Sequence, residues 1–304
     1  MMRKVLLWAS TNPFLAERLP RMGFVKRATS RFMPGESLEE ALAEAEVMSV
    51  KGIGTLVTLL GENLSSIEDA DAVLDQYLGV LRDVTKRGLD AEISIKLTQL
   101  GLDFGPEIAQ EGLRRLAEAT SSIVWIDMES SDYVDVTLDI FRNVKLTHSN
   151  LGLCLQSYLR RTGNDLENLL PLDPSIRLVK GAYKEPREVA YARKSEVDKH
   201  YLRLSNILLN ARLNGAAARP VIATHDKRMI ESVNRIADEL GVQREDYEFA
   251  MLYGIERAEQ DRLARSGHVV RVLICYGSSW FPWYMRRLAE RPANVWFVAK
   301  QLFR

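Results

Sequence analysis

The sequence predicts a single closed (β/α)8 barrel. Two observations support this: short apolar, β-branched runs alternate with longer stretches of helical periodicity, and eight such runs follow one another along the chain. A barrel of this kind takes about 250 residues, so the 304 residues of the chain suffice for one barrel with short extensions.

Each run is expected to be a strand, and several are nearly continuous in apolar residues, as strands buried on both faces should be. The strands are expected at residues 54–60, 91–97, 123–128, 151–158, 176–183, 220–225, 247–252 and 269–274. Helical periodicity lies between them, for instance at residues 72–87, 107–120 and 227–240, with Gly241 as a C-terminal stop.

The chain divides into two parts. Residues 1–35 are expected to form a helical extension, and residues 36–304 the barrel, whose first helix has Ser37 as N-cap and Glu40 three residues later. The amphipathic segment ANVWFVAKQLFR, residues 293–304, is expected to be a final helix over the barrel mouth.

An open, doubly wound sheet of eight strands is the alternative fold. The dinucleotide-binding motif GxGxxG is absent after the first strand, and Gly52 and Gly54 resemble it only superficially. The strand count and order therefore favour the closed barrel.

Charge and cysteine content limit the function classes. The chain has 41 Lys and Arg residues and 41 Asp and Glu residues, so its formal net charge is zero. No net positive charge attracts nucleic acid, and we expect no nucleic-acid partner. Cys154 and Cys275 lie far apart in apolar runs, which argues against a metal site or a disulfide and favours a reducing cytoplasm. The apolar run at residues 5–9 is too short for a signal peptide or a membrane span.

Polar side chains gather where the expected strands end, which is where barrels of this type carry their catalytic groups. Any one of them has an ordinary structural explanation, since rim lysines are often solvated and an aspartate after a strand often caps a helix. The convergence of so many points to a polar ligand or to mutual pairing. The group comprises Glu62, Lys96, Asp127, Glu129, Gln156, Arg177, Lys180, Thr224 and His225, followed by Arg286 and Arg287.

Three residues of this group have a specific chemical interpretation. The alternation of strand residues points Lys96 inward, with Ile93 and Ile95 on the other face. Arg286 and Arg287 follow the aromatic run WFPWY, and guanidinium groups commonly bind a carboxylate at two points.

The segments SIKLTQLG, IDMESSDY, GLCLQSYLRR, IRLVKGAYKEP, VIATHD, FAMLYGI and RRLAE occur in this order. Together they resemble the proline dehydrogenase family, especially its short bacterial members, over residues 52–304. The resemblance implies a flavoenzyme that oxidises a small cyclic amino acid and passes the electrons to a membrane quinone, with peripheral membrane contact.

The resemblance also assigns roles to residues. Lys96, Arg286 and Arg287 would hold the substrate carboxylate, Asp127 and Leu252 would lie near the substrate, and Glu62 would pair with Arg286 as a gate. FAD would contact Arg177 near flavin N5 and Gln156 at the ring edge. The remaining FAD-binding residues would be Lys180, Gly181, Ala182, Thr224, His225 and Glu290.

Two positions depart from the family pattern, and both are expected to face the substrate ring. Leu273 replaces the tyrosine of RVYxPxG, which removes a hydroxyl expected to partner Asp127, and Trp283 replaces the tyrosine three residues before the arginine pair. We therefore expect proline oxidation with a preference for a substituted or enlarged ring such as hydroxyproline, unless Tyr276 restores the hydroxyl.

Two other function classes remain open on the sequence. A Schiff-base lyase barrel could use Lys96 or Lys180 as its amine. A barrel that binds a ligand without turnover is the second class.

Overall fold

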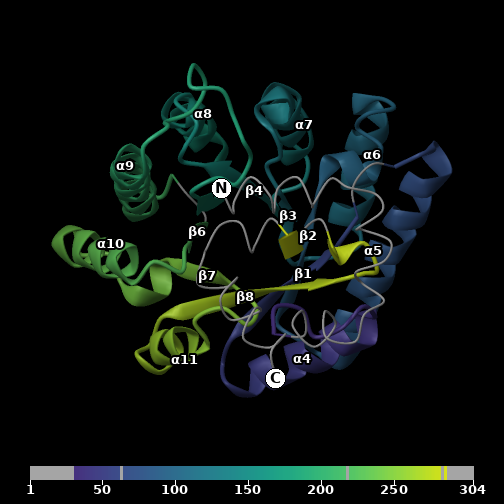
Figure 1. The fold of residues 1–304 in the computed structure, drawn as a ribbon, viewed down its shortest axis with the longest axis horizontal. Helices are drawn as coiled ribbons and strands as arrows, with labels where there is room; N and C mark the ends of the chain where they lie inside the picture. The colour runs from purple at the N-terminus through teal and green to yellow at the C-terminus, as the bar shows by residue number, and fades with distance from the viewer. Residues whose placement is uncertain (1–30, 62–63, 217–218, 282–283, 286–304) are drawn as a thin grey trace, which may run out of the picture.

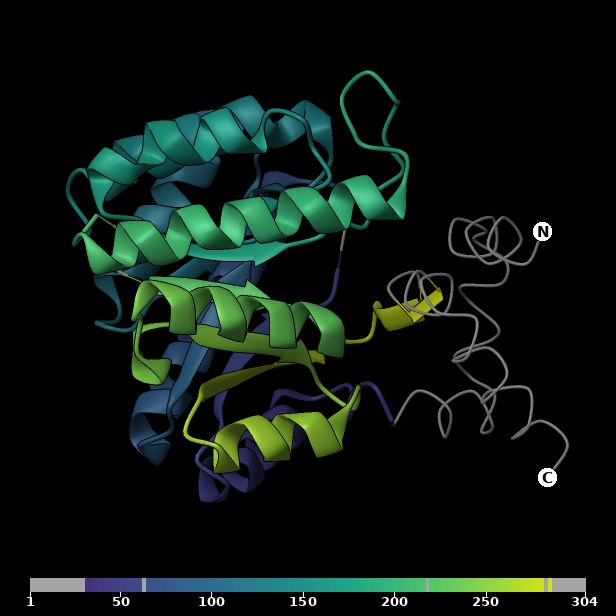
Figure 2. The same ribbon diagram turned by 90° about the vertical axis from the view of Figure 1, so that its left-hand side faces the viewer.

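The computed structural model describes residues 31–61, 64–216, 219–281 and 284–285. In these ranges the chain forms an eight-stranded parallel sheet that closes on itself, because β8 pairs with β1. Figure 1 looks down the barrel and shows the helices around the strands, and Figure 2 shows the helices running alongside them. The predicted (β/α)8 class is therefore confirmed, and the open sheet is excluded.

All eight expected strands are present, although most are shorter than expected. They are β1 (Gly54–Leu59), β2 (Ala91–Ile95), β3 (Val124–Ile126), β4 (Leu151–Gln156), β5 (Ser175–Val179), β6 (Arg219–Ala223), β7 (Glu248–Leu252) and β8 (Val269–Tyr276). The expected strands at 151–158 and 176–183 end early because Ser157 to Leu159 and Lys180 to Tyr183 belong to loops at the barrel mouth.

The helices of the described ranges surround this sheet. They are α4 (Leu38–Val50), α5 (Ile67–Arg87), α6 (Pro106–Glu118), α7 (Val134–Lys145), α8 (Thr162–Leu169), α9 (Lys194–Leu213), α10 (Lys227–Leu240) and α11 (Arg257–Arg265). Short 3-10 turns accompany them at η2 (Leu97–Leu100), η3 (Ser131–Tyr133), η4 (Leu170–Leu172) and η5 (Arg244–Asp246).

The predicted helix boundaries follow local chemistry where capping residues are present. Ser37 and Glu40 form a reciprocal capping box at the start of α4. Helix α10 begins and ends where expected, and Gly241 closes it in the left-handed region at φ +77°. Helix α5 begins at Ile67, five residues before the expected start, because Ser66 and Asp69 form a second capping box.

The barrel interior has a charged layer at the amino-terminal ends of the strands. Arg271 Nε donates to Glu248 Oε2 at 2.9 Å, Arg271 Nη1 to Asp90 Oδ1 at 2.8 Å, and Arg219 Nη2 to Glu248 Oε2 at 2.9 Å. Glu92 also pairs with Arg219. An apolar layer above it contains Leu56, Trp125, Val221 and Ala250.

The segment before α4 packs against the residues that follow β8. Phe32 and Met33 form a buried cluster with Trp280, Phe281, Tyr284 and Met285. Glu36 accepts a hydrogen bond from Trp280 Nε1 at 3.0 Å. The expected helices at residues 1–30 and 293–304 lie outside the described residues, and the division at residue 35 stays a prediction.

Candidate active site

Asp127, immediately after β3, is the centre of a polar group at the carboxyl ends of the strands. Its Oδ1 accepts from Ser94 Oγ at 2.8 Å and from Arg177 Nη2, and its Oδ2 lies 3.4 Å from Lys96 Nζ. Arg177 Nη2 also donates to Ser94 Oγ at 2.9 Å. The fold thus brings together three residues that the sequence singled out, Lys96, Asp127 and Arg177, and adds Ser94.

The local structure explains this convergence. Ser94 and Lys96 are two residues apart at the end of β2 and therefore point to the same side. Asp127 lies next to them because β2 and β3 pair Ile95 with Ile126. Arg177 differs from the expectation of a rim residue: it is the third residue of β5, inside the barrel, and only 5% of its side chain is exposed.

Charge balance controls the protonation of Asp127. Burial alone would raise the pKa of its carboxyl, but the neighbouring Arg177 and Lys96 cations outweigh this, and the pKa lies below its ordinary value. Asp127 is therefore an ionised partner for two cations at neutral pH.

Two buried polar atoms beside this group have no hydrogen-bond partner among the described residues. They are Arg177 Nη1, a donor, and Gln156 Oε1, an acceptor. The amide nitrogen of Gln156 is fixed, since it donates to the carbonyls of Met128 at 3.1 Å and Glu129 at 3.2 Å. Because leaving a buried polar atom unpaired costs about 1 to 3 kcal/mol, a polar group that paired with these two atoms would be stabilised there.

Glu129, two residues after Asp127, turns away from this group toward η2. Its carboxylate accepts from the Thr98 amide at 3.3 Å and the Thr98 hydroxyl at 2.9 Å. Burial raises the pKa of Glu129. Its observed contacts are those of a residue that joins the loops after β2 and β3.

Lys180 belongs to a second charged cluster after β5 and β6. Its Nζ forms an ion pair with Asp198 of α9. It also lies 3.3 Å from a carboxylate oxygen of Asp226, the N-cap of α10. Lys194 pairs with the same two carboxylates. Gly181, the next residue, has φ +105°, and an added Cβ there would lie 2.2 Å from the Tyr158 ring, so only glycine fits without strain.

The remaining predicted residues of β6 to β8 lie at the same end of the barrel. Thr224 Oγ1 accepts from the Asp226 amide at 3.1 Å, and His225 Nε2 accepts from the Leu252 amide at 2.8 Å. Leu252 is the last residue of β7 and pairs in register with Leu273 of β8. Ala182 is exposed in the loop after β5.

Tyr276 does not restore a hydroxyl at Leu273. The two residues are three positions apart on β8, so their side chains point to opposite faces. Leu273 packs on the interior layer with Leu56 and Trp125, whereas Tyr276 belongs to the outer core beneath the helices.

Several predicted residues lie outside the described part of the chain. They are Glu62, Trp283, Arg286, Arg287 and Glu290. The carboxylate clamp and the gate between Glu62 and Arg286 therefore remain predictions.

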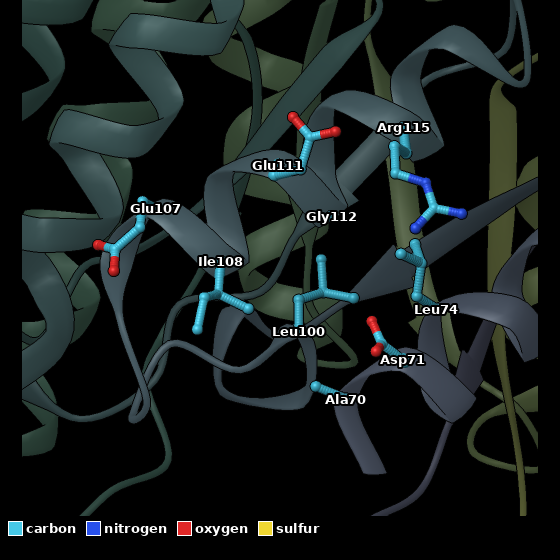
Figure 3. A pocket seen from close by; sticks show the side chains of 9 residues that line it. All are labelled: Ala70, Asp71, Leu74, Leu100, Glu107, Ile108, Glu111, Gly112 and Arg115. Atoms are coloured by element: carbon cyan, nitrogen blue, oxygen red, sulfur yellow. The ribbon is translucent and has the colours of Figure 1, made fainter. Parts of the chain in front are cut away.

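A pocket outside the barrel is separate from this site. It has a volume of about 290 Å³ and is lined by residues of α5, η2 and α6 (Figure 3). Its floor is apolar, with Leu74, Leu100 and Ile108, and Asp71, Glu107, Glu111 and Arg115 also line it. None of the predicted site residues takes part in it.

No helix within the described ranges has both the length and the apolar character needed to cross a bilayer. The same part of the chain contains no group of three or more His, Cys, Asp or Glu side chains that could hold a metal ion.

The fold and the polar group are typical of one class of protein: a (β/α)8 barrel enzyme, with a candidate site at the carboxyl ends of the strands. The family model for proline dehydrogenase matches residues 41–300. The chain therefore belongs to the proline dehydrogenase family and is an oxidoreductase.

Two curated relatives and one solved structure illustrate the similarity. Proline dehydrogenase 1 of Bacillus subtilis subsp. natto is 35% identical over 307 residues, which cover 100% of both chains. Proline dehydrogenase of Deinococcus radiodurans is 35% identical over 310 residues, covering 99% of this chain and 98% of the relative. The proline utilization A (PutA) protein of Bdellovibrio bacteriovorus, crystallised after inactivation by N-propargylglycine, has a TM-score of 0.82 and 24% identity over 95% of this chain and 36% of its own. That structure supports the fold.

Proposed function

We propose that this protein is an FAD-dependent dehydrogenase that oxidises L-proline, or a close cyclic amino acid, to pyrroline-5-carboxylate or the corresponding imine. A hydride leaves the ring carbon next to nitrogen, and the ring nitrogen loses a proton. The electrons then pass to a quinone through peripheral contact with a membrane. The observation that carries the proposal is the buried Lys96–Asp127–Arg177 group in a chain of this family.

The unpartnered atoms beside this group fit a flavin. A flavin ring offers acceptor oxygens and nitrogens as well as one N–H donor, and the site offers Arg177 Nη1 as a donor and Gln156 Oε1 as an acceptor. We propose that these two residues bind the flavin ring and that Lys180, Gly181, Ala182, Thr224, His225 and Glu290 line the rest of the FAD site. The chemistry that bound FAD supplies is two-electron acceptance, which side chains do not provide.

Lys96 and Asp127 orient the substrate rather than transfer its proton. Lys96 Nζ, together with Arg286 and Arg287, would bind the substrate carboxylate, because clustered cations stabilise a carboxylate strongly. Asp127 has a lowered pKa and two cationic partners, so it is a weak base and a strong anchor. The positive charge around the substrate favours loss of the proton from the ring nitrogen.

The geometry of the site favours the dehydrogenase over the Schiff-base lyase. A Schiff-base lysine has to become a neutral amine before it attacks a carbonyl. Both candidate lysines are ion-paired, Lys96 with Asp127 and Lys180 with Asp198 and Asp226. Each amine nitrogen is therefore in contact with carboxylates and is not free to attack a carbonyl.

The apolar side chain of Leu273 supports a change in ring preference. It faces the barrel interior, where the family pattern has a tyrosine, and Leu252 is its register partner. We propose that proline oxidation is retained and that a substituted or larger ring, such as hydroxyproline, is the favoured substrate. Steady-state kinetics on a panel of ring analogues tests this, and a clear maximum for unmodified proline would remove the reason for it.

Anaerobic mixing tests the proposed function as a whole. The purified protein is expected to be yellow, and proline or a close ring analogue is expected to bleach its flavin absorbance. Stoichiometric flavin that no cyclic amino acid bleaches would instead support a binding protein without turnover. Borohydride trapping of a carbonyl substrate on a lysine would support the lyase.

A further inference from the structure

Trp125 occupies the centre of the barrel directly beneath the proposed active site. It is the middle residue of β3 and is fully buried. The guanidinium carbon of Arg177 lies 5.3 Å from its ring centroid, and that of Arg219 lies 5.5 Å away. The indole is therefore in contact range of two cations, one of which belongs to the site.

The strand register places these two arginines at different levels of the barrel. Arg219 pairs with Ser175, whereas Arg177, two residues further along β5, pairs with Val221. Arg177 is thus nearer the mouth and Arg219 nearer the base. The indole connects the polar group around Asp127 with the charged layer at the amino-terminal ends of the strands.

The indole itself is held in place by two features. Its Nε1 donates to Glu92 Oε2 at 2.7 Å, and Glu92 also pairs with Arg219. Gly152 is its register partner on β4, and a Cβ on Gly152 would lie 2.4 Å from the indole Cε3. Since even a methyl group there would displace the ring, Gly152 provides the space that the indole occupies.

An ordinary packing role would also place a large side chain here, because barrel interiors are filled by layers of side chains. Packing alone does not require an aromatic face beside a guanidinium. A desolvated cation near an aromatic ring is attracted to it by the ring's charge distribution. Arg177 is also held by hydrogen bonds to Asp127 and Ser94.

We propose that Trp125 is a positioning residue for Arg177. Its ring keeps the guanidinium where Nη2 meets Asp127 and Ser94 while Nη1 stays available to the bound flavin. This inference rests on the proposed function in one respect only, namely that Arg177 acts on the flavin. The contact between Trp125 and Arg177 can be tested without it.

The contact is tested on the full chain by the indole region of a nitrogen–proton NMR spectrum. The Trp125 resonance is identified as the one missing in Trp125→Phe. Substituting Arg177→Met should shift it, whereas Arg160→Met, which removes a cation stacked on Tyr191 instead, should not. A Trp125 resonance that ignores Arg177→Met overturns the proposal, whatever the activity of the protein.

The positioning role is tested on the flavin-loaded protein with three variants. Trp125→Leu should lower kcat/KM on the order of tenfold, the scale of a lost cation–π contact. Trp125→Phe should recover most of this loss, because the aromatic face remains. Phe141→Leu, a fully buried position on α7 away from the barrel interior, controls for loss of core packing.

The flavin midpoint potential separates positioning from packing. A less firmly held Arg177 stabilises the reduced flavin less, so Trp125→Leu should lower the potential by about 30 mV, which is a tenfold effect for a two-electron couple. Phe141→Leu should leave the potential unchanged. Equal potentials and equal kcat/KM in Trp125→Leu and Phe141→Leu would overturn the positioning role. A wild-type protein that binds no flavin would refute the proposed function instead, with the NMR result still standing.

Discussion

Replacing Asp127 by asparagine removes an anion that two largely buried cations, Arg177 and Lys96, share. Asp127→Asn keeps an oxygen that can accept from Ser94 and Arg177 but deletes the charge that balances Arg177 and Lys96. The Arg177 side chain is only 5% exposed, so solvent cannot replace the lost partner. Breaking a buried pair from one side costs about 3 to 5 kcal/mol. Because the asparagine oxygen retains part of the bonding, we expect a loss near the lower end, about 3 kcal/mol.

Denaturant unfolding at a fixed FAD concentration measures this loss. Asp165→Asn is the matched control, since Asp165 is also a largely buried aspartate paired with an arginine, Arg161, but on α8 outside the barrel. That arginine is 39% exposed, so we expect a loss of about 1 kcal/mol or less. Equal stability of Asp127→Asn and the wild type would refute the reasoning.

The pH dependence of the same comparison has a fixed sign. The pKa of Asp127 is lowered in the folded protein, so its stabilisation is complete above the ordinary aspartate value of about 3.9 and is lost as the pH falls through the lowered value. The stability difference between the wild type and Asp127→Asn should therefore shrink on strong acidification. A difference that grows as the pH falls would contradict this assignment.

Three further predictions follow from buried groups. Burial lowers the pKa of His268 from 6.5 to about 4, so as the pH falls the unfolded chain binds a proton before the folded protein does. The free energy of unfolding should therefore fall by about 3 kcal/mol between pH 6.5 and 4. In unfolding measured across this pH range, His268→Phe should abolish the dependence, whereas His148→Gln should preserve it. Gln156→Leu should weaken FAD binding about tenfold by titration calorimetry, since the acceptor Oε1 is lost; unchanged affinity would remove Gln156 from the flavin site. Gly181→Ala should cost about 2 kcal/mol or more in thermal or denaturant unfolding, because φ is +105° and the Tyr158 ring leaves no room for a Cβ; a variant as stable as the wild type would contradict the strain argument.

The sequence predicted the fold through repetition. Eight buried runs separated by helical segments are enough to indicate a barrel, since each run need not be placed accurately for the count to hold. The strand ends were less predictable, because residues such as Ser157 and Lys180 continue an extended run in sequence but belong to the loops at the mouth. The same ambiguity made Arg177 look like a rim residue when it lies inside β5.

The candidate site was predicted in part. Lys96 and Asp127 stood out because a charge after an apolar run is conspicuous, and the structure brings both to Arg177. Ser94 was missed, although it lies two residues before Lys96 and therefore on the same side of β2. Trp125 was missed because a tryptophan in a buried strand resembles ordinary core, and the arginines beside it come from strands far away in sequence.

The most direct test of the central claim is a crystal structure of the protein with FAD and an unreactive analogue of proline in which oxygen replaces the ring nitrogen. We predict that the flavin ring accepts a hydrogen bond from Arg177 Nη1 and donates one to Gln156 Oε1. The analogue's carboxylate should lie against Lys96, Arg286 and Arg287. A flavin bound away from Arg177, or a carboxylate held elsewhere in the barrel, would contradict the proposed site.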